Sequence, residues 1–141
     1  MARLSGKTFT AQLSQFKGKT VAKVEKIVRD SVQDVLEGAQ TTARGISVGG
    51  TLIPGRIPVA SGDLVNSLVS TVGGAGSSGS ASYVTAIAGY EIGEFMRFEW
   101  TQIYALPIEV GFGTYIGAQF VGINAAKFSE HVERNARLAG D

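Results

Sequence analysis

The chain of 141 residues is 44% hydrophobic and 18% charged, with one histidine and no cysteine. We expect residues 1–141 to form a single domain, because a chain of this length and composition can close one core without metals or disulfides. The absence of cysteine excludes disulfide scaffolds, thiolate catalysis and cysteine-ligated zinc.

Basic and acidic residues are unevenly distributed, although the formal net charge is +1. Residues 1–44 contain eight lysines or arginines and four acidic residues, whereas residues 45–141 contain five and eight. A basic first segment is typical of a nucleic-acid arm or of contact with an acidic neighbour, but lysines at helical spacing favour a solvated helix face. No apolar run reaches the roughly 18 residues of a membrane span, and the start of the chain is too polar for a signal peptide. We therefore expect no membrane partner.

Residues 10–43 have the pattern of a long amphipathic helix, with apolar residues every three or four positions and charged residues between them. The apolar positions are Leu13, Phe16, Val21, Val24, Ile27 or Val28, Val32, Val35 or Leu36, and Ala39. Such a helix spans roughly 50 Å, which exceeds the width of a compact domain with a radius of gyration of about 14 Å. We expect either a break at Gly18 or a projecting end whose apolar stripe is covered by self-association.

Residues 44–60, RGISVGGTLIPGRIPVA, predict an exposed loop, because Pro54 and Pro58 remove backbone donors and fix φ. The segment is too apolar for a loop that faces only solvent, so we expect it to lie against another surface. Its large apolar residues are Ile46, Val48, Leu52, Ile53 and Ile57.

Residues 61–118 predict a small antiparallel sheet. Ser61 or Asp63 caps a short helical turn, and the β-branched residues near Val69 begin a strand. The segment 73–82, GGAGSSGSAS, predicts a flexible hairpin tip. A phosphate-binding loop is the alternative, but the closing Lys-Ser/Thr of a P-loop is missing.

The returning strand of this hairpin is expected in SYVTAIAGY, residues 82–90. A third strand is expected in FMRFEWTQ, where Met96, Phe98 and Trp100 alternate with polar residues. Residues 119–138 predict a closing helix with Gly140 just past its end. Its apolar stripe consists of Phe120, Ile123 or Asn124, Phe128 and Val132. The expected fold is therefore α+β, with a long N-terminal helix and a C-terminal helix packed on a small antiparallel β-sheet.

Residues suited to catalysis or metal binding are sparse. His131 is the single histidine, and on a charged helix we expect it to be a surface residue rather than a general base. The sequence has neither a pair of ligands at helical spacing nor an acidic calcium loop. Glu91, Glu94 and Glu99 are candidate acid–base groups, but no pattern brings them together. We expect no enzyme, no catalytic residue, no cofactor and no metal.

Glu109 admits both a catalytic and a structural interpretation, and the structural one is preferred. YALPIEV, residues 104–110, predicts a helical turn, and Gly111 and Gly113 suit positive-φ positions behind it. The carboxylate then accepts backbone N–H groups of the glycine turn or pairs with an arginine, because an unpaired buried carboxylate is costly.

Two stretches form a pair of motifs: PVASGDLVNSL at residues 58–68 and YALPIEVGFGT at residues 104–114. Together they resemble the tail-completion or neck proteins of long-tailed bacteriophages, a family of minor tail components. The positions that carry the resemblance are Pro58, Gly62, Leu64, Ser67, Tyr104, Glu109, Gly113, Thr114 and Phe120. The chain departs from the family pattern at EVGFGT, where the family has Gly-Thr directly after Glu and one hydrophobic residue. After Phe120 the family often has Arg-Pro, where this chain has Gly-Ile-Asn.

The resemblance implies a structural virion protein, assembled in the host cytoplasm as one subunit of a homo-oligomeric ring in the neck. It implies contact with a head connector or stopper and with a tail terminator or tube protein, and genomic DNA passing through the ring. Roughly six copies are implied, with roughly twelve as the alternative. A tail-terminator or head-closure ring subunit is a second hypothesis. A third is a nucleic-acid-binding protein that uses the basic helix. Its residues are Lys17, Lys19, Lys23, Lys26 and Arg29.

Overall fold

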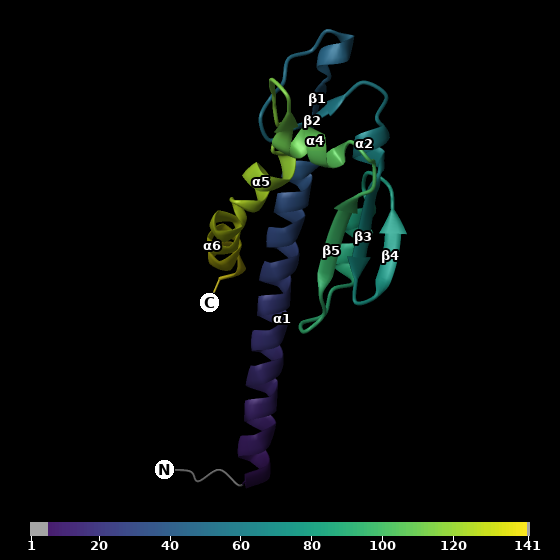
Figure 1. The fold of residues 1–141 in the computed structure, drawn as a ribbon. Coiled ribbons are helices and arrows are strands. Elements are labelled where there is room, and N and C mark those ends of the chain that lie inside the picture. The colour runs from purple at the N-terminus through teal and green to yellow at the C-terminus, as the bar shows by residue number, and fades with distance from the viewer. Residues whose placement is uncertain (1–5, 141) are drawn as a thin grey trace.

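The computed structural model describes the backbone of residues 6–140 and the side chains of residues 18–140 except residue 115. Helix α1 (Gly6–Ala39) is unbroken, so of the two alternatives the break at Gly18 is wrong and the projecting end holds. The helix begins and ends four residues earlier than predicted. The Cβ that Gly18 lacks would meet nothing within 4 Å, so this glycine has no packing role that bends the helix. The N-terminal part of α1 extends past the rest of the molecule (Figure 1). The side chains of Leu13 and Phe16 lie outside the described residues.

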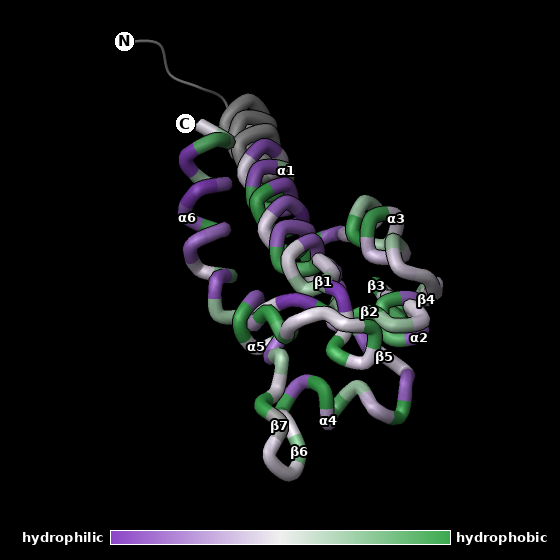
Figure 2. The backbone as a smooth tube through the Cα atoms, turned by 90° about the horizontal axis from the view of Figure 1, so that it is seen from above, coloured by the Kyte–Doolittle hydropathy of each residue, from purple (hydrophilic) through white to green (hydrophobic). Residues whose placement is uncertain are grey.

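The fold is α+β, as predicted, with α1 in the middle. Helix α6 (Phe128–Ala139) lies along one side of α1, and the sheet lies on the other (Figure 1). Helix α3 (Ser82–Ala88) is on the same side of α1 as the sheet (Figure 2). The C-terminal helix therefore packs on α1 instead of directly on the sheet. Leu36 and Ala39 of the predicted apolar stripe are buried where α1 enters the body of the domain.

The sheet contains three antiparallel strands in the order β4-β3-β5: β3 (Leu68–Val72), β4 (Ala75–Ser78) and β5 (Met96–Trp100). Trp100 pairs with Leu68 at one end of β5, and Met96 pairs with Val72 at the other. The alternation predicted for β5 is confirmed, because Met96, Phe98 and Trp100 are half-buried and the residues between them are exposed.

The hairpin is present, but its second strand lies at residues 75–78 and not at the predicted residues 82–90. The turn is only Gly73–Gly74, both with positive φ, and β4 lies inside the segment expected to be a flexible tip. An edge strand whose side chains are all exposed needs only backbone pairing, so its glycines and serines are tolerated. Residues 82–88 form α3 and not a strand; Ser82 Oγ lies 2.9 Å from Ser70 Oγ on β3.

Residues 44–60 are more ordered than the predicted loop. They include a 3₁₀ turn, η1 (Ile46–Val48), and strand β2 (Ile57–Val59), which pairs in parallel with β1 (Thr42–Arg44). Pro58 is tolerated within β2 because the pairing uses its neighbours: Ile57 N donates to Thr41 O, and Gly45 N donates to Val59 O, both at 2.9 Å. The predicted turn near residue 63 is confirmed as α2 (Asp63–Asn66), but its N-cap is Gly62 and not Ser61 or Asp63.

The predicted helix at 119–138 is two helices, α5 (Phe120–Ala125) and α6, separated at Ala126 and Lys127. Asn124 Nδ2 donates to Phe120 O at 2.7 Å and to Gly55 O at 2.9 Å and so holds α5 against the loop before β2. The apolar stripe does not continue across the break: Phe120 is buried, whereas Phe128 is exposed. Gly140 directly follows α6, as predicted, and has φ 71°.

Candidate functional site

The segments that carry the family resemblance share one core. Leu64 from α2, Phe120 from α5, Ile57 from β2 and Ala118 are all nearly inaccessible to solvent and form one cluster. Trp100, at the end of β5, packs its ring edge-to-face on Phe120, with ring centroids 5.2 Å apart and an interplanar angle of 81°. Ala105 and Ile108 of the second motif pack against this cluster. The two motif segments are therefore neighbours in space although about 40 residues separate them in the sequence.

Glu109 lies on helix α4 (Ala105–Val110) and caps α5. Its carboxylate accepts Val121 N at 2.9 Å and Gly122 N at 2.8 Å. These are first-turn N–H groups of α5, which have no partner within the helix and favour a negative charge nearby. The expectation of backbone N–H donors is confirmed, but the donors belong to α5 and not to the turn at Gly111.

The glycines behind α4 form a short hairpin of β6 (Gly111–Phe112) and β7 (Tyr115–Ile116). Gly111 has φ 88° and Gly113 has φ 59°, the positive values predicted for them. Gly113 and Thr114 are at the exposed tip of this hairpin. The α4 helix and the hairpin project away from α1 and the sheet, as Figure 2 shows.

An apolar groove of about 480 Å³ lies between the segment 45–64 and the α4–hairpin segment. Four of the motif positions, Pro58, Gly62, Leu64 and Tyr104, line it. Asp63 is the one charged residue among those that line it. The other motif positions do not line the groove. Ser67, for example, is the residue after α2, and its hydroxyl donates to Leu64 O at 2.8 Å.

Exposed apolar side chains are concentrated in the two chain segments that form this groove. Of fifteen large hydrophobic residues that are exposed in the described part of the chain, nine belong to segments 46–53 and 103–116. They are Ile46, Val48, Ile53, Ile103, Tyr104, Leu106, Val110, Phe112 and Ile116. Ile103 is 94% exposed and Ile116 is 79% exposed. Four of the nine, Ile46, Tyr104, Phe112 and Ile116, line the groove itself. Exposed apolar patches are typical of interaction sites, and we call these nine residues with the groove the groove surface.

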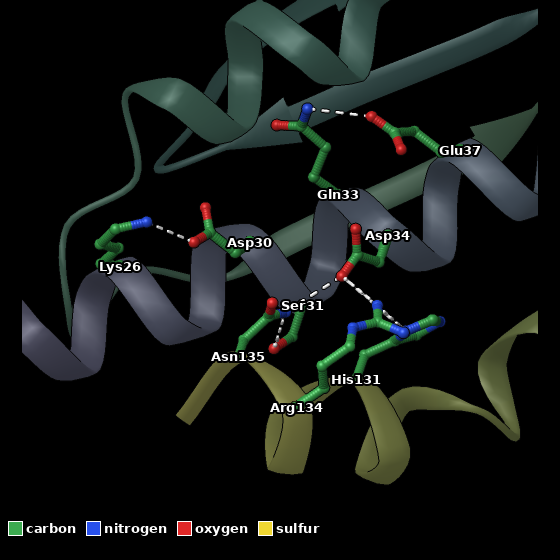
Figure 3. A network of polar contacts seen from close by, with 9 residues as sticks. All are labelled: Lys26, Asp30, Ser31, Gln33, Asp34, Glu37, His131, Arg134 and Asn135. Atoms are coloured by element: carbon green, nitrogen blue, oxygen red, sulfur yellow. Dashed lines mark hydrogen bonds and ion pairs between the residues drawn. The ribbon is translucent and has the colours of Figure 1, made fainter. Parts of the chain in front are cut away.

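His131 is not the surface residue predicted, because its side chain is only 16% exposed and lies between α1 and α6 (Figure 3). Arg134 Nη2 donates to Asp34 Oδ2 at 2.9 Å and lies 2.8 Å from His131 Nδ1. Asn135 Nδ2 donates to Asp34 Oδ2 at 3.0 Å and to the fully buried Ser31 Oγ at 3.1 Å. The cluster brings a serine, a histidine and an aspartate close together, but the serine is sealed from solvent and bonded to Asn135, so the contacts join α1 to α6.

The remaining carboxylates considered for acid–base chemistry have local partners. Glu94 accepts Glu91 N at 2.7 Å and thereby closes the turn before β5. Glu99 lies 3.4 Å from Arg97 on the exposed face of β5.

Tyr83 is a residue whose pKa is perturbed: burial, and next the charge of Glu37, raise it above the ordinary value for a tyrosine. Among the described residues, no group of acidic or histidine side chains is placed to hold a metal ion.

Gln40 and Gly117 are important residues that the sequence pattern did not single out. Gln40 Oε1 accepts Trp100 Nε1 at 2.8 Å, while its Nε2 donates to the carbonyls of Val65 and Ser80 at 2.9 and 2.8 Å. A Cβ at Gly117 would collide with the backbone of Glu109. A polar residue at a helix end and a glycine in a loop carry no local signal for such distant partners.

No helix among residues 6–140 combines the length and the apolar character needed to cross a bilayer. In comparisons with known proteins, no family model matches the chain, and neither a curated protein nor a solved structure matches it.

Proposed function

We propose that the protein is a structural virion protein: one subunit of a homo-oligomeric ring at the head-to-tail junction of a long-tailed bacteriophage, where it joins the connector to the tail. The observation that carries the proposal is the groove surface, a concentration of exposed apolar side chains built around the paired motifs. A small domain that exposes this much apolar area is suited to permanent contact with other subunits. Closed rings cover such surfaces by repeating one contact.

The polar chemistry of the described residues agrees with a structural role. The carboxylate of Glu109, in the second motif, accepts two backbone N–H groups of the first turn of α5. The Asp34 cluster is committed to the contact between α1 and α6. We therefore propose no catalytic activity, no cofactor and no metal for this protein.

The basic-helix hypothesis receives less support, because two of its five residues have partners in the fold. Lys26 Nζ lies 2.6 Å from Asp30 Oδ2, and Arg29 Nη1 donates to Tyr90 O at 2.9 Å. The side chain of Lys17 lies outside the described residues. Specific nucleic-acid binding through this helix would weaken steeply as salt is raised, so retention on immobilised DNA across a salt series tests it.

The proposal is tested by locating the protein in purified particles. We expect mass spectrometry to find it in complete virions and averaged images to place it between head and tail. We also expect that phage lacking the gene accumulates separate heads and tails, and that supplying the protein restores joined particles. Absence from virions, together with normal assembly without the gene, would refute a junction role. A position at the end of the tail tube or against the head portal would favour the tail-terminator or head-closure alternative.

A further inference from the structure

The groove surface and the N-terminal end of α1 lie at opposite ends of the molecule (Figure 1). We call residues 6–24 of α1 the arm. At 1.5 Å per residue the arm is about 28 Å long. The tertiary contact of Arg29 with Tyr90 comes after the arm in the sequence, and from Arg29 the helix continues without interruption to Gly6. Because α1 has no break, the arm cannot fold back to the groove of its own chain, and any contact between them joins two copies.

We infer that the arm of one copy seats in the groove surface of a second copy. The inference rests on the ring assembly proposed above and names the contact that builds it. The groove is apolar, with a single charged lining residue, and so is suited to an amphipathic helix. The arm carries the first part of the apolar stripe that the sequence predicts in α1, and Val24 at its end is exposed.

Charge complementarity favours a second copy as the occupant. The arm contains four lysines, at positions 7, 17, 19 and 23, and no acidic residue. Residues 25–141, which follow the arm, contain eight basic and twelve acidic residues. A positive arm is therefore attracted to a neighbour's negative body, while two arms repel each other, which disfavours an arm-to-arm dimer.

The geometry of this contact leads to a closed assembly. The arm is one surface and the groove is another, so the contact is head-to-tail, and each copy offers one arm and one groove to its neighbours. Repetition of a head-to-tail contact closes into a ring when the rotation between neighbours divides a full turn. The same contact covers the groove surface in every subunit.

The absence of cysteine makes the contact measurable by cross-linking, since every thiol is then an introduced one. One preparation carries Leu13→Cys in the arm, and a second carries Ser47→Cys, an exposed residue that lines the groove. A third carries the matched control Ser129→Cys on the exposed side of α6. Each groove or control preparation is mixed with the arm preparation and treated with a short bismaleimide.

We expect the arm–groove mixture to give at least about tenfold more cross-linked dimer than the arm–control mixture, because thiols held in contact have effective concentrations in the millimolar range. A chain that carries both Leu13→Cys and Ser47→Cys should give a ladder of products that stops at the ring size.

Three results would overturn the inference: equal yields with Ser47→Cys and Ser129→Cys, dimers formed mainly between two Ser47→Cys chains, or products confined to single chains. Light scattering on the unmodified protein separates this failure from that of the proposed function. A defined oligomer with only control-level cross-linking refutes the arm contact and leaves the ring role standing. A monomer at every concentration refutes both.

Discussion

Replacing Glu109 with alanine removes both acceptors that hold the first turn of α5, at 2.9 and 2.8 Å. Hydrogen bonds to a charged group contribute about 1.5–3 kcal/mol each, and loss of a helix cap costs about 0.5–2 kcal/mol. Glu109 is only half-buried, so water partly replaces the lost acceptors. We therefore expect a loss of about 2–3 kcal/mol of unfolding free energy, which corresponds to a decrease in Tm of roughly 5–10 °C for a chain of this size.

The assay is thermal and denaturant unfolding of three variants measured side by side. Glu109→Gln keeps one acceptor oxygen but turns an amide NH₂ toward the second donor, so we expect about half of the loss. Glu99→Ala is the matched control: it removes an exposed glutamate whose ion pair with Arg97 is worth at most about 0.5 kcal/mol. If Glu109→Ala lowers Tm no more than Glu99→Ala does, the capping argument is wrong.

Further predictions concern two glycines, a tyrosine and the groove surface. Gly117→Ala should destabilise the protein by about 1–3 kcal/mol, because the added Cβ collides with the α4 backbone. Gly18→Ala should stabilise it by about 0.5–1 kcal/mol, because alanine favours the helix more than glycine does and its Cβ meets nothing. Equal changes in the denaturation midpoint of the two variants would contradict this. The pKa of Tyr83 is raised in the folded state. The contribution of Tyr83 to the free energy of unfolding is therefore complete below the unfolded pKa of about 10 and is lost as pH rises through the folded pKa. Replacing the tyrosine in Tyr83→Phe should reduce the fall in Tm above a pH of about 10. Leu106→Glu should weaken self-association by ~10-fold or more, while Leu138→Glu on α6 should not, and identical light-scattering curves for the two would count against the groove surface.

The long helix and strand β5 were predictable because each follows its period over many residues. The helix α3 was missed although Tyr83, Ile87 and Tyr90 are four and three residues apart, since β-branched neighbours and a glycine-rich segment before it suggested a hairpin. Strand β4 was missed because it has no apolar face to detect. For β4 the deciding interaction is backbone pairing with β3, and α3 contacts the same strand through Ser82 and Ser70; both contacts are set by tertiary structure.

The groove surface was predictable only in part. Excess apolar residues in 44–60 suggested that this loop contacts another surface, and Tyr104 and Pro58 were singled out through the paired motifs. That both segments face one groove depends on Phe120 and Leu64 sharing a core, and on Glu109 holding α5 beneath α4. Such contacts join residues far apart in the chain, and no spacing rule connects them.

The unbroken course of α1 also determines where mechanical strain enters the molecule. The helix ends at Ala39, next to Gln40, whose side chain is bonded to Trp100 and to the carbonyls of Val65 and Ser80. A pull on the N-terminal end is therefore transmitted along a stiff rod to the centre of the domain, where three separate segments resist it together. One of these segments, at Ser80, comes just after the edge strand β4, so tension between neighbouring molecules would also reach the edge of the sheet.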